Sequence, residues 1–279
     1  MKTQFRRLIR FKDHSGRTTF GEAPPGDNWQ GKPAIVYRGT IPWHLETTDE
    51  TAEIAEILSP LASTPIIYGV GLNYKTHIAE AGFPTPPYPT IFVKPPDALN
   101  GPYSDIPVDS QCLNMDYEGE LGVIIGKDTK NADPATAIDH VLGYTVVNDV
   151  SSRYWQMPER SGQQHGYAKS FDGFAPLGPM IVSAAVADPD QLTLVTRVNG
   201  EERQRAGIDD LLFKVGDIIS HLSRATTLHA GTVIMTGTPG GVAAFRQPPV
   251  WLQDGDVVEV SISGIGAIRN RFAFIPAGG

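Results

Sequence analysis

The chain has a single cysteine, Cys112, among its 279 residues. This excludes a disulfide within the chain and a zinc site built on paired cysteines, and we expect Cys112 to be a reduced, buried side chain. No run of about 18 apolar residues is present, so no segment has the length that a membrane-spanning helix requires. We therefore expect a cytoplasmic protein. A mitochondrial location is the alternative, because the basic start MKTQFRRLIRFK is typical of a transit peptide as well as of an amphipathic first strand.

Positive charge is also scarce, with 23 Lys and Arg against 31 Asp and Glu and a formal net charge of −8. An acidic protein repels phosphate backbones and anionic membranes, so we expect neither nucleic acid nor a membrane as a partner. The stretch Gly69-x-Gly71 lacks the third glycine of a dinucleotide fingerprint, and the phosphate-loop, HExxH and GxSxG motifs are missing. The remaining partner class is a small molecule.

Glycine (29) and proline (23) are plentiful and spread along the chain, which predicts many short elements joined by turns. We predict an α+β fold with mixed β-sheets, divided into a small N-terminal strand and helix module (1–63) and a catalytic domain (64–279). Apolar runs predict strands, and helical spacing predicts helices. The expected strands are 120–126 and 143–149, the expected helices are 48–58, 151–160 and 215–228, and Asn199-Gly200 is the expected turn of a hairpin.

Three carboxylates stand at the ends of apolar strands. Glu118 and Glu120 are two residues apart, which in a strand places both on one face with Cα atoms roughly 6.7 Å apart. Asp149 directly follows the run TVVN. Carboxylate oxygens without nearby Cys or His are ligands for a hard cation such as Mg²⁺, Mn²⁺ or Ca²⁺. The alternatives are a solvated strand face for the glutamates and a helix N-cap or turn for Asp149.

Seven segments together resemble the fumarylacetoacetate hydrolase superfamily, in the family's order and over about residues 66–272. They are GVGLNYKTHIAEAG, IFVKPPDALNGPY, DYEGELGVIIGKD, NDVSSRYWQ, AKSFDGFAPLGP, TGTPGGV and GDVVEVSISGIGAIRN. The resemblance implies that Glu118, Glu120 and Asp149 are the metal ligands, with Mg²⁺ or Mn²⁺ as the cofactor and Ca²⁺ as an open alternative. It also implies the family's mixed-sheet roll with a small N-terminal domain, and a homodimer.

The same resemblance implies further site residues. His77 and Glu80 match a catalytic pair on a mobile lid, and a spacing of i, i+3 lets the carboxylate orient the imidazole. Lys75-Thr76 stands where the family often has Arg-Asp. Lys169 matches an active-site lysine, whereas Arg153, Gln156 and Thr238 match substrate-binding positions. For each of these residues the alternative is an ordinary surface, helix-face or turn role.

A cation beside a lysine and a His–Glu pair suits a 2-oxo acid, which would react through a metal-bound enolate. The stretch at 244–256, AFRQPPVWLQDGD, is similar to the domain-containing-protein-2 branch of the family, whose members resemble oxaloacetate tautomerases. We therefore expect tautomerisation or decarboxylation of an oxaloacetate-like substrate. The alternatives are C–C bond hydrolysis of acylpyruvate or fumarylacetoacetate-type substrates, a specialised enzyme acting on a larger β-diketo acid, and a catalytically silent homologue.

Overall fold

The computed structural model describes residues 3–26, 28–82 and 84–276, and for 77, 80 and 81 it describes the backbone alone. Among the described residues, strands far outnumber helices. In order, the strands are β1 (Arg7–Lys12), β2 (Thr18–Glu22), β3 (Pro33–Arg38), β4 (Glu46–Glu53), β5 (Glu56–Leu58), β6 (Ile67–Gly71), β7 (Thr90–Lys94), β8 (Leu99–Asn100), β9 (Ile106–Val108), β10 (Met115–Asp116), β11 (Gly119–Ile125), β12 (Val141–Asn148), β13 (Ser151–Ser152), β14 (Ala175–Ser183), β15 (Thr193–Val198), β16 (Glu201–Gly207), β17 (Val233–Met235), β18 (Val257–Ile262) and β19 (Gly266–Phe274).

The helices are short. The α-helices are α1 (Lys75–Ala81), α2 (Arg153–Gln156), α3 (Pro158–Ser161) and α4 (Val215–Leu222). The 3-10 turns are η1 (Pro96–Ala98), η2 (Ala137–His140), η3 (Tyr167–Lys169), η4 (Pro189–Gln191), η5 (Ile208–Asp210) and η6 (Ala243–Phe245). Across the described residues, none of the helices is long and apolar enough to pass through a membrane.

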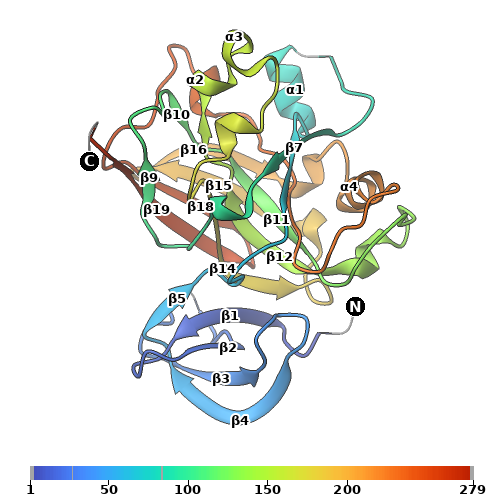
Figure 1. Ribbon diagram of the computed structural model, residues 1–279, viewed down its shortest axis with the longest axis vertical. Helices are drawn as coiled ribbons and strands as arrows, with labels where there is room; N and C mark the ends of the chain where they lie inside the picture. The colour runs from blue at the N-terminus through green and yellow to red at the C-terminus, as the bar shows by residue number, and fades with distance from the viewer. Residues whose placement is uncertain (1–2, 27, 83, 277–279) are drawn as a thin grey trace.

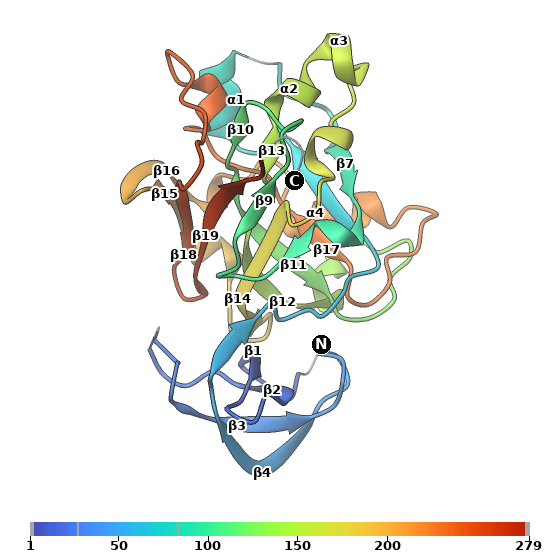
Figure 2. The same cartoon turned by 60° about the vertical axis from the view of Figure 1, so that its left-hand side comes forward.

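One large sheet runs through the molecule in the order β4-β3-β2-β1-β14-β12-β11-β17-β6-β7. Along this order the pairs are antiparallel except β17 with β6. Off this order, β8 pairs in parallel with β14, so the sheet is mixed. A five-stranded sheet, β16-β15-β18-β19-β9, packs against β14, β12 and β11 (Figure 2). The predicted α+β class with mixed sheets is confirmed.

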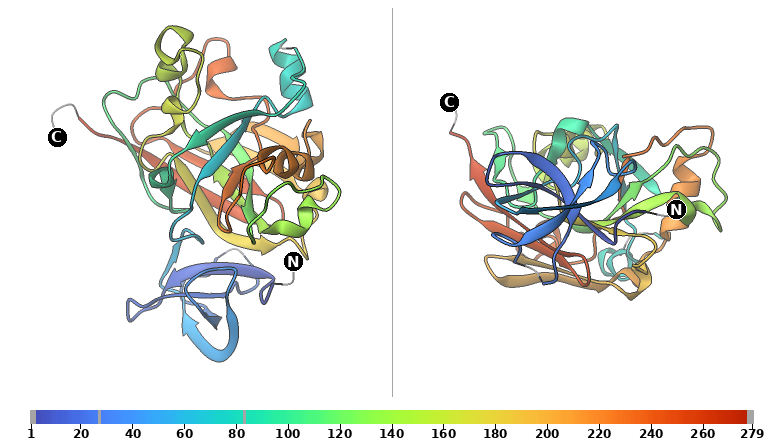
Figure 3. Two further views of the ribbon diagram at one scale, coloured as in Figure 1. Left: turned by 45° about the vertical axis from the view of Figure 1, so that its right-hand side comes forward. Right: turned by 90° about the horizontal axis from the view of Figure 1, so that it is seen from below.

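The N-terminal strands β1 to β4 stand below the rest of the molecule, at the end opposite α1, α2 and α3 (Figure 1). The left view of Figure 3 shows the same separation from another direction. Strand β1 nevertheless continues the main sheet, because Leu8 pairs with Ile181 of β14. The predicted boundary at residue 63 falls between β5 and β6, and the division into two domains stays a prediction.

Buried apolar side chains form two clusters, and the neighbouring residues Val123 and Ile124 of β11 belong to different ones. This explains why the central strands are continuously apolar. Every residue of β11, β12 and β14 is buried. Strands covered on both faces lose the alternation of apolar and polar residues, which is why 120–126 and 143–149 were recognisable in the sequence. The hairpin is also confirmed: Asn199 and Gly200 have φ values of 51° and 84°, as a primed two-residue turn needs.

The helix predicted at 48–58 is wrong, because that stretch forms β4 and β5. β-Branched Thr48 and Thr51 favour the extended conformation, and pairing of β4 with β3 and of β5 with β1 satisfies the backbone. The helix predicted at 151–160 is divided into α2 and α3, since Pro158 cannot continue α2 and instead starts α3. The helix predicted at 215–228 ends at Leu222.

Candidate metal centre and active site

The pairing of β11 with β12 brings three carboxylates together. Because the strands are antiparallel with Gly119 opposite Asn148, Glu118 just before β11 meets Asp149 just after β12. The backbone N–H of Asp149 donates to the carbonyl of Glu118 at 2.8 Å. Glu120 shares the face of Glu118 through the two-residue repeat of the strand. All three side chains are buried, and one carboxylate oxygen from each lies within 4.8 Å of the other two.

Lys169, at the end of η3, lies against two of these carboxylates. Its Nζ donates to Glu118 Oε2 at 2.9 Å, to Asp149 Oδ2 and to Ser151 Oγ at 2.8 Å. Burial lowers the pKa of Lys169, but the charges of Asp149 and Glu118 outweigh that effect and the pKa is raised. All three N–H directions of the ammonium group are therefore in use, and the lysine is charged.

Lys94, the last residue of β7, is a site residue that the sequence analysis missed. Its side chain is fully buried, and Nζ donates to Asp149 Oδ1 at 2.5 Å and to the carbonyls of Val150 and Phe174. Burial lowers its pKa, against the opposing charge of Asp149. The signal in the sequence was a lone lysine closing the apolar strand TIFVK. Lys94 fixes the orientation of Asp149 from the side opposite the cluster's other lysine.

Arg153, at the start of α2, connects the carboxylate cluster to the helix. Its Nη2 donates to Glu118 Oε1 at 2.5 Å, its Nε to Asp116 Oδ2 at 2.8 Å and its Nη1 to Gln156 Oε1 at 2.6 Å. Asp116, a second residue missed from the sequence, also accepts the backbone N–H of Ala243 at 2.7 Å. Burial lowers the pKa of Arg153, but Glu118 and Asp116 outweigh it and raise the pKa. The guanidinium group is thus a fixed, charged part of the wall.

Glu120 is the member of the trio whose ionised form is least favoured. Burial, followed by the negative charges of Asp149 and Glu118, raises its pKa well above the ordinary value, although the Gly237 N–H donates to its Oε2 at 2.6 Å. Two of the acids, Glu118 and Asp149, already have lysine or arginine partners, whereas no described cationic side chain bonds to Glu120. A cluster that forces a carboxylate to hold a proton is one that a cation would stabilise.

The residues fit a hard divalent cation. The candidate ligand set is made of oxygen alone, as Mg²⁺, Mn²⁺ and Ca²⁺ prefer. With Glu120 ionised, four carboxylates face three cationic side chains and one negative charge is in excess, whereas with Glu120 protonated the charges balance. The acids are Asp116, Glu118, Glu120 and Asp149, and the bases are Lys94, Arg153 and Lys169. A bound divalent cation would make the net charge of the site positive, and the site would then attract an anionic substrate.

The cluster opens into a cavity of about 570 Å³. Its polar lining consists of Thr90, Glu118, Arg153, Gln156, His165, Lys169 and Thr238. The rest of the wall is mostly apolar, with Val70, Leu72, Phe92, Met157, Pro158, Val242, Ala244, Phe245 and Trp251. The structure therefore places the predicted Gln156, Lys169, Arg153 and Thr238 around one hollow together with Glu118.

The hydroxyl of Thr238 already has two partners. It donates to the carbonyl of Gly119 at 3.0 Å and accepts from Gln204 Nε2 at 2.8 Å. Its donor is thus used to join the turn after β17 to the start of β11. The role predicted for Thr238 toward a substrate carboxylate stays a prediction, which rests on the backbone amides of the turn.

His77 and Glu80 lie in α1, next to the segment 82–89 that the sequence predicts as part of a lid. The structure describes their backbone, so the spacing of i, i+3 on one helical turn is present. The positions of both side chains lie outside the described residues. The predicted catalytic pair therefore stays a prediction.

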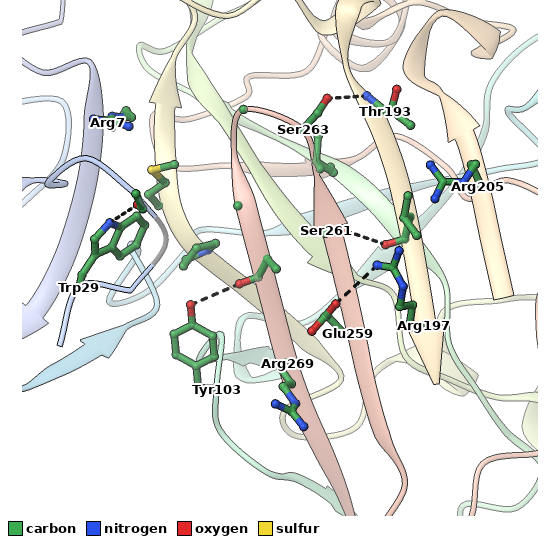
Figure 4. Close-up of a pocket in the computed structure, with 18 residues that line it drawn as sticks. Arg7, Trp29, Tyr103, Thr193, Arg197, Arg205, Glu259, Ser261, Ser263 and Arg269 are labelled. Atoms are coloured by element: carbon green, nitrogen blue, oxygen red, sulfur yellow. Dashed lines mark hydrogen bonds and ion pairs between the residues drawn. The ribbon is translucent and has the colours of Figure 1, made fainter. Parts of the chain in front are cut away.

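A second cavity, of about 660 Å³, lies over the five-stranded sheet (Figure 4). Four arginines line it: Arg7, Arg197, Arg205 and Arg269. The charge of Arg197 is met by Glu259 at 3.6 Å within the same cavity. Within the part of the chain that the structure describes, one group of Asp, Glu, His or Cys side chains has the spacing of metal ligands. This is the trio Glu118, Glu120 and Asp149, which does not line the second cavity. The candidate metal ligands therefore lie beside the first cavity.

Comparison with known proteins gives concordant results. The family model for the fumarylacetoacetate (FAA) hydrolase C-terminal region matches residues 66–273. A human protein named mitochondrial oxaloacetate tautomerase FAHD2A is 42% identical over 215 residues, which cover 77% of this chain and 68% of that protein. A solved structure of 2-hydroxyhepta-2,4-diene-1,7-dioate isomerase from Mycobacterium marinum has a TM-score of 0.83 at 33% identity and covers 98% of this chain and 99% of its own. The fumarylacetoacetate hydrolase of Exiguobacterium antarcticum has a TM-score of 0.80 at 34% identity, with 96% and 99% covered.

Proposed function

Since this chain belongs to the fumarylacetoacetate hydrolase family, we propose that it enolises 2-oxo acids in a divalent-metal-dependent reaction, with an oxaloacetate-like substrate favoured. The predictions of the family and of an enzyme of this superfamily are confirmed. The observation that carries the proposal is the trio Glu118, Glu120 and Asp149 beside a cavity. The name of the human relative supports oxaloacetate as the first substrate to test.

We propose that Glu118, Glu120 and Asp149 hold Mg²⁺ or Mn²⁺, with Ca²⁺ as the alternative. Mg²⁺ retains waters that a substrate can displace, which suits a site with three protein ligands and an adjoining cavity. When bound, the cation supplies a Lewis acid that stabilises the negative charge developing on the substrate oxygens.

The protein's own residues would bind the substrate and move the proton. Lys169 would donate to a substrate oxygen, which must replace one of the three acceptors that the ammonium group now has. Arg153 and Gln156 would face the far end of the substrate, and the turn at Thr238 would receive its carboxylate through backbone amides. His77, oriented by Glu80, would transfer the proton between C3 and the oxygen on C2. The double bond would move between C2–O and C2–C3 at the same time, and tautomerisation requires no further change.

The proposal is tested by incubating the pure protein with oxaloacetate and Mg²⁺ or Mn²⁺ while enol absorbance and pyruvate release are followed together. Metal-dependent enol decay without pyruvate identifies a tautomerase, and pyruvate release identifies a decarboxylase. EDTA and Glu118→Ala are expected to abolish the signal. Glu53→Ala is the matched control, since that carboxylate lies exposed on β4. An equal rate in Glu118→Ala and Glu53→Ala would refute the role of the trio.

A second function, C–C bond hydrolysis of acylpyruvates or larger β-diketo acids, is favoured by the shape of the cavity. A volume of about 570 Å³ with a largely apolar wall exceeds the needs of a four-carbon diacid. In this reaction His77 would take a proton from water, whose oxygen attacks the distal carbonyl at C4. The C3–C4 bond would then break, and pyruvate would leave as its enolate, which receives the proton at C3. Release of a carboxylic acid from an acylpyruvate, with no turnover of oxaloacetate, would make this the primary activity.

We also propose a homodimer located in a reducing compartment, the cytosol first and mitochondria as the alternative. The buried, unpaired Cys112 supports a reducing compartment, and the name of the human relative includes a mitochondrial location. Light scattering tests the dimer, and a single monomeric species would refute it. Cell fractionation distinguishes the two compartments.

A further inference from the structure

The segment between α3 and η3 places His165 in the wall of the metal-side cavity. This histidine belongs to no motif recognised in the sequence, and the proposed reaction gives it no role. Its ring is half-buried and lies 6.5 Å from the ring of Phe92, centroid to centroid. Depending on its tautomer, the ring can present either a donor or an acceptor to a bound molecule.

Two hydrogen bonds determine which nitrogen of the His165 ring carries the proton. Arg153 Nη1 lies 2.6 Å from Gln156 Oε1, and a guanidinium group can only donate, so the amide of Gln156 is oriented with its oxygen toward Arg153. The NH₂ group of Gln156 therefore faces His165, with Nε2 at 2.6 Å from Nδ1. An amide NH₂ also can only donate, so Nδ1 must be an unprotonated acceptor. The ring proton is consequently on Nε2.

The charge state follows from the same geometry. A doubly protonated His165 would place two donors against each other at Gln156. Burial, and then the positive charge of Lys169, lower the pKa of His165 below its ordinary value, against the smaller effect of Glu118. The ring is therefore a neutral imidazole with a single donor, Nε2–H.

The surroundings of that donor select its ligand. Among the described residues that line the cavity, Arg153 and Lys169 are the cations, and both are engaged by carboxylates. Nε2 of His165 has no hydrogen-bond partner in the described part of the chain, and much of the remaining wall is apolar. A second carboxylate in this part of the cavity would lose its water without gaining a cation. A ketone or ester oxygen needs a single neutral donor.

We propose that His165 is a specificity-determining residue that donates from Nε2 to a neutral oxygen at C4 of the 2-oxo acid. The inference rests on the proposed function for the placement of the substrate's C1 and C2 oxygens near the carboxylate trio. It predicts that 4-acyl or 4-ester 2-oxo acids gain more from this contact than diacids such as oxaloacetate do, so it supports the second function given above. Gln156, which touches the ring and not this oxygen, acts as a positioning residue.

The kinetic test compares 2,4-dioxopentanoate with oxaloacetate, because both enolise and both are followed by enol absorbance. His165→Phe keeps a ring but removes the donor, and the kcat/KM ratio of dioxopentanoate to oxaloacetate is expected to fall by about three- to tenfold, chiefly through KM. His165→Gln, which offers an amide N–H in place of Nε2–H, should retain most of the ratio. His14→Phe, an exposed histidine near Glu53, is the background control. An unchanged ratio in His165→Phe would overturn the proposal.

A spectroscopic test is independent of turnover. In the ¹⁵N-histidine-labelled, Mg²⁺-loaded protein, the long-range ¹H–¹⁵N spectrum should show His165 as the Nε2–H tautomer, identified by its disappearance in His165→Gln. Adding 2,4-dioxopentanoate should shift this signal more than adding oxalate, which chelates but has no C4 oxygen. A protonated Nδ1 at neutral pH, or equal shifts with both ligands, would overturn the proposal. If the tautomer and the selective shift are seen while neither acid is enolised, the proposed function fails and the assignment of His165 stands.

Discussion

The substitution Lys94→Met isolates the contribution of one buried charge. Lys94 is fully buried, and its removal would leave Asp149 Oδ1 and the carbonyls of Val150 and Phe174 without that donor. Breaking a buried ion pair from one side destabilises a protein by about 3–5 kcal/mol, because the remaining charge loses a compensating partner. Asp149 would keep Lys169 alone as a cationic partner among the described residues. With an unfolding entropy of about 2.1 cal/mol/K per residue, this corresponds to a fall of roughly 5–10 °C in the midpoint of thermal unfolding.

The assay is thermal unfolding followed by circular dichroism in EDTA, so that a bound cation does not add to the stability of the folded state. Lys12→Met is the matched control, because Lys12 has an ion pair of 2.8 Å with Glu56 but both side chains are about half exposed. An exposed pair contributes about 0–1 kcal/mol, so the control should change the midpoint little. If Lys94→Met lowers the midpoint no more than Lys12→Met does, the reasoning from burial is wrong.

Two further predictions concern the same region. Because the pKa of Glu120 is raised, its carboxyl group retains a proton in the metal-free site, and a bound cation must displace that proton. The affinity for Mn²⁺ should therefore fall as pH falls. Calorimetry in buffers of different ionisation enthalpy should show proton release on binding, and this release should be smaller in Glu120→Gln. Gly241→Ala should lower the unfolding midpoint more than Gly255→Ala, because both have positive φ but only the first would place a Cβ 2.0 Å from the carbonyl oxygen of Arg203. Equal midpoints for the two alanine variants would contradict the second prediction.

The parts of the fold that were predictable depend on local signals. The strands at 120–126 and 143–149 were recognisable because they are buried on both faces and therefore continuously apolar. The carboxylate trio was recognisable because strand alternation and strand ends are properties of the chain itself. The structure then supplied what the sequence lacked: the register that places Glu118 beside Asp149.

The parts that were missed depend on contacts between distant segments. Residues 48–58 have apolar positions at helical spacing, and only pairing with neighbouring strands overrides that pattern. Lys94 is one lysine in an apolar strand, and its partner lies 55 residues further along the chain. Asp116 and His165 acquire their roles only when Arg153 and Gln156 are in place, so their type and spacing alone carried no signal.

The distribution of charge over the site has a consequence for the order in which the molecule assembles. The β11–β12 pair contains Glu120 and has Glu118 and Asp149 at its ends. The lysines that pair with Glu118 and Asp149 come from β7 and η3. A hairpin formed early in folding would therefore keep its carboxylates in water until both other segments docked, since burying them unpaired is costly. The central strand pair would be completed late, after contacts that are distant in sequence have closed. Tight binding of a metal ion would then show that every segment around the site has reached its native arrangement.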